Sequence, residues 1–166
     1  MLKWIGAVCV IAGAGLSGMD IYLQKKKEVE TTEAVLKTLR FMKDEMRYTK
    51  TLIGNVFSKC ATLNSLTCNF YKRMSDGLRE GKVLSDLWRT GVEQLTGINS
   101  LLKTELLELG EVLGTVELDM QDNILTHAVS KIEQIKNDQK QELETKGKLY
   151  SKIGFGIGAL VVILLI

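Results

Sequence analysis

Residues able to do chemistry are few and scattered in this chain. His127 is the single histidine among 166 residues, and a lone helical imidazole is far more typical of a surface or satisfied residue than of a catalyst. Cys60 and Cys68 are on similar faces of expected helices, but no further cysteine or histidine completes a zinc set. We therefore interpret both thiols as buried and expect no metal site.

The acidic and glycine-containing segments do not form a catalytic pattern either. Carboxylates recur at helical spacing at Glu105, Glu108 and Glu111, which indicates a solvated helix face rather than a paired acid and base. No phosphate-binding loop, dinucleotide-binding turn or nucleophile elbow is present. The glycines that come nearest to a phosphate loop lie inside an apolar segment: Gly13, Gly15 and Gly18. The sequence thus predicts no catalytic residue, no cofactor and no small-molecule substrate, and an enzyme is the least favoured class.

The composition favours an all-α protein. Proline is absent, whereas about 5% is usual, and long glycine- or serine-rich linkers are missing too. The net charge is +2, from 22 basic and 20 acidic residues, which argues against a strongly basic face for nucleic acid. About 120 residues lie between the two apolar ends, enough for one modest core. We expect a compact bundle of about five or six helices, flanked by N- and C-terminal membrane helices.

Both ends of the chain are apolar and predict membrane segments. Leu2 to Leu23 holds about the 20 apolar residues that a helix needs to cross a bilayer. Ile153 to Ile166 is shorter, roughly 21 Å of helix, so shallow insertion is the alternative to spanning there. The expected division is a transmembrane anchor over 1–24, a cytoplasmic helical domain over 25–150 and a C-terminal membrane segment over 151–166.

A cleaved signal peptide is the main alternative for the N-terminal segment. Its small-residue cleavage site would be Ala12-Gly13-Ala14. The apolar stretch continues beyond that site to a basic cluster, which favours a retained anchor.

Two lysine clusters predict the orientation in the membrane. One follows the first apolar segment and the other precedes the second, so both flank the middle domain, and positive flanks stay in the cytoplasm. The topology-setting residues are Lys25, Lys26, Lys27, Lys146, Lys148 and Lys152. An odd number of cysteines, Cys9, Cys60 and Cys68, is also typical of a reducing compartment.

Small residues one turn apart occur in both apolar segments. Ala14 and Gly18 form such a pair in the first segment, and Gly154 and Gly158 form a Gly-x-x-x-Gly in the second. Pairs of this kind let helix backbones approach closely in lipid. Helix association, within one chain or between chains, and simple glycine usage in membrane helices remain equal alternatives.

Apolar residues at spacings of three and four predict the helices of the middle domain. The expected stripes are Val35, Leu39, Met42 and Met46 on a helix over 28–49; Leu52, Val56, Cys60 and Leu63; Phe70, Met74 and Leu78; Trp88, Val92 and Leu95; Leu102, Leu106, Leu109 and Leu113; and Ile124, Ala128, Val129, Ile132 and Ile135. We expect Gly81 and Gly97 to end the third and fourth helices, and Ser85 and Ser100 to cap the N-termini of the fourth and fifth. The last helix should start near 117–119 and continue through a polar, solvated stem over 136–152 into the final apolar segment.

The corner between the last two expected helices, from Leu109 to Gln121, is the candidate partner-docking surface. Gly114 permits a left-handed turn, and Asp119 favours the positive N-terminus of the following helix. Gly110 is costly inside a helix, so it marks either a close helix crossing or a partner contact. The candidate docking residues are Gly110, Glu111, Gly114, Asp119 and Gln121.

Several segments together resemble one known family. They are the opening Met1-Leu2-Lys3-Trp4-Ile5-Gly6-Ala7, the basic residues after Tyr22, Leu84-Ser85-Asp86-Leu87-Trp88, the Leu109 to Gln121 corner and the ending Val161-Val162-Ile163-Leu164-Leu165-Ile166. In this order and spacing the chain resembles, over its full length, the stage III sporulation protein AB family of endospore-forming bacteria. It departs from that family at Thr115–Asp119, where a shorter Leu-Gly-x-Ser-Asp is more usual.

The resemblance implies a non-enzymatic platform or adaptor subunit of the channel complex between mother cell and forespore, similar to the platform protein of type II secretion. It implies as partners the sporulation ATPase, stage III sporulation protein AA, other membrane subunits of the complex, and membrane lipid. Self-association is left open. The expected location is the mother-cell membrane around the forespore, with the middle domain in the cytoplasm. Glu111 and Asp119 could then meet basic groups on the ATPase.

A structural membrane scaffold of the cell envelope or division apparatus is the alternative function. Such a protein would self-associate through its long final helix and would not need an ATPase.

Overall fold

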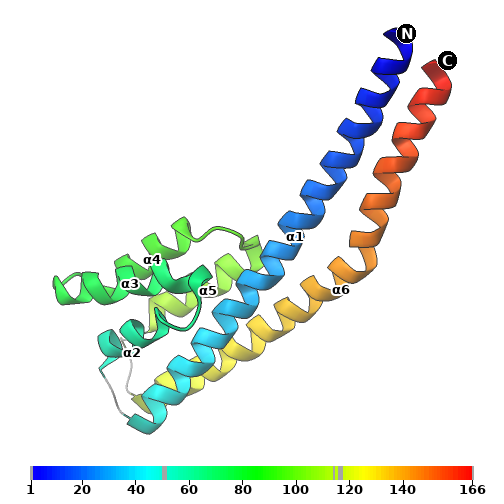
Figure 1. Cartoon of the computed structure of the whole chain (residues 1–166). Coiled ribbons are helices and arrows are strands. Elements are labelled where there is room, and N and C mark those ends of the chain that lie inside the picture. Colours follow the sequence, from blue (N-terminus) through cyan, green and yellow to red (C-terminus); the bar gives the residue numbers. More distant parts are fainter. Residues whose placement is uncertain (1, 50–51, 114, 116–117, 166) are drawn as a thin grey trace. The chain divides into compact units, whose positions relative to one another are not determined.

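The chain is entirely helical over the residues that the computed structural model describes. It describes the backbone over 2–49, 52–113, 115 and 118–165, and side-chain surroundings over 19–48, 52–113, 115 and 120–146. No strand occurs in these ranges. The helices are α1 (Leu2–Thr49), α2 (Ile53–Cys60), α3 (Ser65–Arg79), α4 (Leu84–Gln94), α5 (Ser100–Val112) and α6 (Leu118–Leu165). The predicted all-α class is confirmed (Figure 1).

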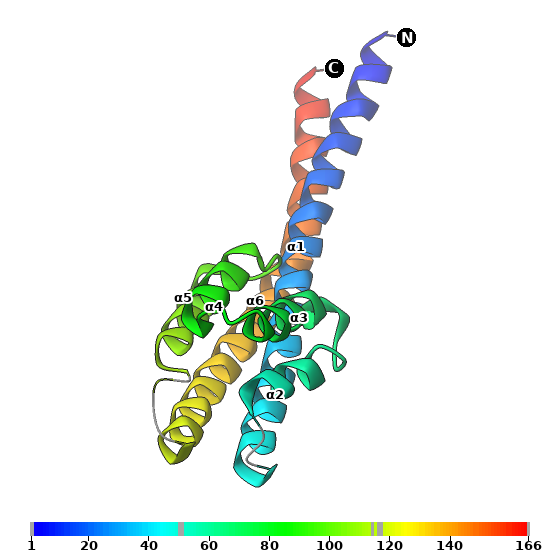
Figure 2. The ribbon, with the colours of Figure 1, turned by 90° about the vertical axis from the view of Figure 1, so that its left-hand side faces the viewer.

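The chain divides into two compact units. One contains Met1–Val29 and Asp138–Ile166, and the other is Glu30–Asn137. Within Glu30–Asn137, the short helices α2 to α5 lie on one side of the segments that α1 and α6 contribute (Figures 1 and 2). An ion pair of 2.7 Å between Arg40 and Glu133 joins those two segments. The Arg40 guanidinium lowers the pKa of the Glu133 carboxyl.

The core of Glu30–Asn137 draws on all six helices. Its largest fully buried side chains are Trp88, Tyr71, Phe57, Leu36, Leu39, Met42, Met74, Leu102, Leu106, Leu113, Leu125 and Ile132. The predicted stripes of α1, α3 and α5 pack into this core, as do most residues of the others. The prediction that Leu52 belongs to the buried stripe of α2 is wrong, because Leu52 is the exposed N-cap residue before the helix. Phe57, which the stripe did not include, is buried instead.

Helix ends follow the sequence in part. Gly81 adopts φ +78°, the left-handed conformation that glycine tolerates, and Lys82 N–H donates to Gly77 O at 3.0 Å, so α3 ends in the Schellman turn that its glycine predicts. Gly97 also has φ +75°, but it lies in the loop after α4 has ended at Gln94.

Both predicted serine caps are wrong. The N-cap of α5 is Asn99, whose Oδ1 accepts a hydrogen bond from Leu102 N–H at 2.9 Å, and Ser100 is already helical. Asn and Ser cap helices about equally well, so the sequence alone does not decide between Asn99 and Ser100 as the N-cap. Helix α4 begins one residue before Ser85, and its N-cap Val83 makes no side-chain capping bond.

The two long helices are unbroken. The sequence predicts continuity for α6, and the backbone is helical from Leu118 to Leu165. It predicts a separate helix over 28–49 at the other end, but α1 runs from Leu2 to Thr49 without interruption. The lysines at 25–27 change the polarity of the chain and not its conformation, because lysine is a good helix former.

The predicted stem is mostly solvated where the structure describes it. Residues 136–146 are exposed or half-buried with one exception, Gln139, which is buried. Neither polar atom of its amide has a hydrogen-bond partner among the described residues.

A small polar cluster lies inside the core between α1, α2 and α3. The hydroxyls of Thr38 and Tyr71 are hydrogen-bonded at 3.0 Å, and Cys60 Sγ lies 3.8 Å from the Thr38 carbonyl oxygen. Burial, reinforced by the negative charge of Glu45, raises the pKa of the Cys60 thiol to about 12. The thiol therefore stays protonated and acts as a small packing group.

Cys60 should resist alkylation in the folded protein. At pH 8 a pKa of about 12 leaves only about one thiol in ten thousand as the reactive thiolate, and burial blocks access. Peptide mapping after iodoacetamide treatment should find Cys60 unmodified in buffer and modified in 8 M urea. Full modification of Cys60 in buffer would contradict this core.

Candidate docking surface

Helix α4 is joined to α5 by one tryptophan and one glycine. Trp88 is fully buried, and its Nε1–H donates to the Leu106 carbonyl oxygen at 2.6 Å. The indole lies directly on Gly110: a Cβ added there would come 2.7 Å from Trp88 Cγ and 2.8 Å from Nε1. Gly110 therefore marks a close helix crossing, one of the two roles that its position predicts.

Two further glycines allow α3 and α4 to pack closely. A Cβ at Gly77 on α3 would come 2.7 Å from a methyl carbon of Leu87, and one at Gly91 on α4 would come 2.7 Å from the terminal methyl of Met74. The same Cβ at Gly91 would also come 2.8 Å from the Phe70 ring, which packs edge-on against Trp88 with ring centroids 5.0 Å apart. The α3–α4–α5 layer is thus held by apolar side chains seated on glycines.

The structure separates the five predicted docking residues. Glu111 is exposed, with Oε1 3.6 Å from Arg89 Nη2. Gly110 and Gln121 are buried, so neither offers its side to a partner on the surface. Gly114 and the side chain of Asp119 lie outside the described residues. Of the predicted docking residues whose side chains are described, Glu111 is the exposed one.

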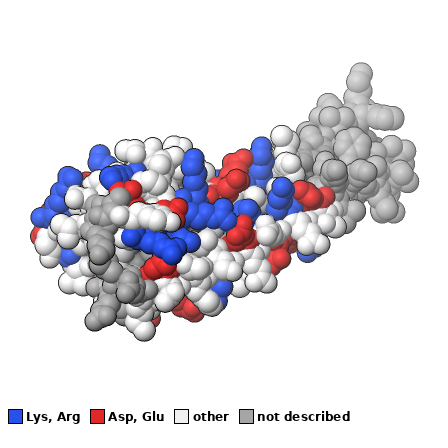
Figure 3. Space-filling model, turned by 90° about the horizontal axis from the view of Figure 1, so that it is seen from below, with Lys and Arg blue, Asp and Glu red and all other residues white. Residues whose placement is uncertain are grey.

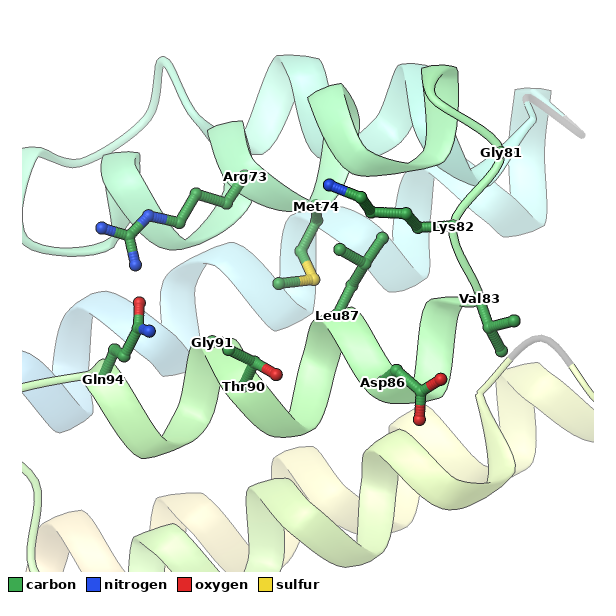
Figure 4. Close-up of a pocket in the computed structure, with 10 residues that line it drawn as sticks. All are labelled: Arg73, Met74, Gly81, Lys82, Val83, Asp86, Leu87, Thr90, Gly91 and Gln94. Atoms are coloured by element: carbon green, nitrogen blue, oxygen red, sulfur yellow. The ribbon is translucent and has the colours of Figure 1, made fainter.

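A groove lies along the seam between α3 and α4, where no sequence motif points to a site (Figure 4). It encloses about 420 Å³. Its lining residues are Arg73, Met74, Gly81, Lys82, Val83, Asp86, Leu87, Thr90, Gly91 and Gln94. The apolar part is central, and charged or amide side chains stand at both ends.

Charges of both signs are interspersed on the face of the molecule that Figure 3 shows, in line with the balanced composition. Several form ion pairs, such as the exposed pair of Lys82 with Glu80 at 2.7 Å and the pair of Lys131 with the half-buried Glu105 at 3.1 Å. Lys82 lowers the pKa of the Glu80 carboxyl by hydrogen bonding and by its charge.

Groups able to hold a metal do not come together in the described part of the chain. No cluster of three or more His, Cys, Asp or Glu side chains with that geometry occurs there. His127 is exposed, Cys60 is buried and Cys68 is half-buried, and both thiols are unpaired.

The residues predicted to act in the membrane are only partly described. Among the described residues, no helical stretch has both the length and the apolar character needed to cross a bilayer. Most of 2–23 and all of 153–166 lie outside the described side chains, as do Ala14, Gly18, Gly154 and Gly158. Of the topology-setting lysines, Lys25 pairs with Glu28 at 3.1 Å and Lys146 with Glu142 at 3.2 Å, both within one helix turn. Lys148 and Lys152 lie outside the described side chains.

Comparison with known proteins identifies the family. The family model described as stage III sporulation protein AB matches residues 3–166. The chain belongs to this family. It is also similar to the stage III sporulation protein AB of Bacillus subtilis (strain 168), with 25% identity over 173 aligned positions covering 99% of both chains. No solved structure matches.

Membership of the stage III sporulation protein AB family assigns the chain a role in sporulation and confirms the resemblance of the sequence segments. Leu84–Trp88, one of those segments, now has a physical role, because it brings Trp88 onto Gly110 and Leu87 onto Gly77. The groove between α3 and α4 had no comparable sequence signal. Its lining residues come from two helices, so it forms only when those helices pack together.

Replacing Gly110 by alanine should destabilise the fold by about 1–3 kcal/mol, because the new methyl group overpacks the core against Trp88. Gly54 is the matched control: a Cβ there would meet only Leu78, at 3.7 Å. Gly54→Ala should be neutral or stabilising by up to about 1 kcal/mol, as helix propensity favours alanine. Urea unfolding followed by circular dichroism measures both, and equal effects would contradict the Trp88–Gly110 contact.

Proposed function

We propose that the protein is a membrane-anchored platform subunit of the sporulation channel between mother cell and forespore, where it docks a cytoplasmic ATPase. Family membership supports the sporulation role. The finer role rests on the helices: α1 and α6, 48 residues each, both supply core residues to Glu30–Asn137 and continue without a break toward the apolar ends of the chain. An adaptor needs a folded domain with continuous connections of this kind.

Apolar residues at the described start of α1 support membrane anchoring. Met19, Ile21, Tyr22 and Leu23 are all exposed. Consecutive helical residues point in directions about 100° apart, so these side chains are solvent-facing on several sides of one helix. Although the exposed Asp20 lies among them, a group of exposed apolar side chains of this kind is typical of a membrane or partner contact.

Glu111 is the described residue that we propose for ATPase docking at the α5–α6 corner. Its carboxylate is exposed, and its 3.6 Å pairing with Arg89 joins two exposed side chains. Such surface pairs are worth little, so a basic group on a partner could replace Arg89 readily. Asp119 stays a second candidate at the same corner.

Affinity purification of the detergent-solubilised protein from sporulating cells tests the proposal. Mass spectrometry should recover the sporulation ATPase with membrane subunits of the channel. Glu111→Lys should lower ATPase recovery about tenfold, a loss of about 1.4 kcal/mol. Glu93→Lys, a charge reversal at an exposed site on α4, should leave recovery unchanged. Recovery of the protein alone, or with division proteins, would contradict the adaptor role and favour the scaffold alternative.

Membrane anchoring makes a separate prediction. The protein should stay with the membrane pellet after an alkaline carbonate wash, since that treatment removes peripheral proteins held by charge. Release into the supernatant would contradict a spanning anchor.

A further inference from the structure

The groove between α3 and α4 continues beyond the part shown in Figure 4. A second hollow, of about 150 Å³, is lined by Leu66, Asn69, Phe70, Leu95 and Thr96 together with Arg73, Gly91 and Gln94. The last three residues also line the larger hollow. The two hollows therefore form one elongated groove along the hairpin. It follows the 11 residues of α4, which corresponds to about 16 Å or three helical turns.

The groove has an apolar interior, and one exposed apolar side chain lies at each end beside the polar groups. Met74 and Leu87 lie in its central part (Figure 4). Val83 at one end has an exposed fraction of 62%, and Leu66 at the other has 40%. Both are large apolar side chains left in water beside an open cleft, an arrangement that an apolar occupant would relieve.

A cation and an amide stand together where the two hollows meet. Arg73 extends from α3 and Gln94 from α4, at the same end of the larger hollow (Figure 4). Arg73 is exposed and makes no ion pair with any described residue, whereas the Lys82 side chain extends back over the central part of the groove (Figure 4) and its ammonium pairs with Glu80 at 2.7 Å. A planar guanidinium is suited to bidentate binding of a carboxylate.

The opposite end of the groove carries a negative charge. Asp86 lines it beside Val83, eight residues along α4 from Gln94, which is about 12 Å. A carboxylate would be attracted at the Arg73 end and repelled at the Asp86 end. This asymmetry gives any acidic occupant one preferred direction.

We propose that the α3–α4 groove binds a segment of a partner protein about three helical turns long, with apolar side chains over Met74 and Leu87 and a carboxylate on Arg73. The charge complementarity at Arg73 and the two exposed apolar ends identify this occupant. The length and openness of the groove suit a peptide segment laid along two helices better than a compact small molecule. This surface goes beyond ATPase docking at Glu111, and the two contacts are tested by different variants.

Site-specific photocrosslinking in sporulating cells tests the occupant directly. A photoreactive amino acid at Thr90, an exposed residue of the groove, should crosslink to a partner peptide that has an Asp or Glu next to large apolar residues. The matched control is Lys103, exposed on α5 and outside the groove. A crosslink to a second copy of this chain, to lipid, or equally from Lys103 would overturn the proposal.

Charge reversal then tests the anchor. Arg73→Glu should lower the Thr90 crosslink at least tenfold, Arg73→Lys should retain part of it, and reversing the crosslinked carboxylate on the partner should restore it to Arg73→Glu. Circular dichroism checks that each variant is folded. A Thr90 crosslink that is unchanged by Arg73→Glu would show that no carboxylate binds Arg73 and would refute the proposal. ATPase recovery in the same preparations reports on Glu111, so failure of one proposal is distinguishable from failure of the other.

Discussion

The packing of Trp88 on Gly110 is the constraint on which the arrangement of the short helices depends. The indole fills the space that a side chain at residue 110 would occupy and donates its N–H to the α5 backbone. The same ring meets Phe70 of α3 and Phe57 of α2, with centroids 5.0 and 6.1 Å apart. One side chain therefore connects four helices. Because Trp88 and Gly91 are three residues apart on one face of α4 and Phe70 of α3 contacts both, the position of the α3–α4 seam follows from this packing.

The helices could be predicted from the sequence because their stripes repeat locally. Leu102, Leu106 and Leu109 alone identify one buried face of α5, since residues three and four apart share a face of a helix. Gly81 likewise predicts the turn at the end of α3, because few other residues adopt a positive φ. In both cases the information lies within a few neighbouring positions.

The site could be predicted less well because it depends on distant residues. Gly110 has two meanings in the sequence, and only its contact with Trp88, 22 positions earlier, decides for packing. The placement of Arg73 and Gln94 at the same end of the groove follows from the close approach of two helices at Gly77 and Gly91. The continuity of α1 was missed for another reason. A change from apolar to charged residues suggests the end of a helix, although the backbone can stay helical across it.

The buried amide of Gln139 weakens the packing of one face of α6. Its amide is buried without a hydrogen-bond partner among the described residues, and burying such a group costs about 1–3 kcal/mol. Turning it toward water would remove that penalty, whereas turning the fully buried Ile132 outward would forfeit apolar burial with no such gain. A small rotation of α6 about its own axis thus meets less resistance near Gln139 than two turns earlier.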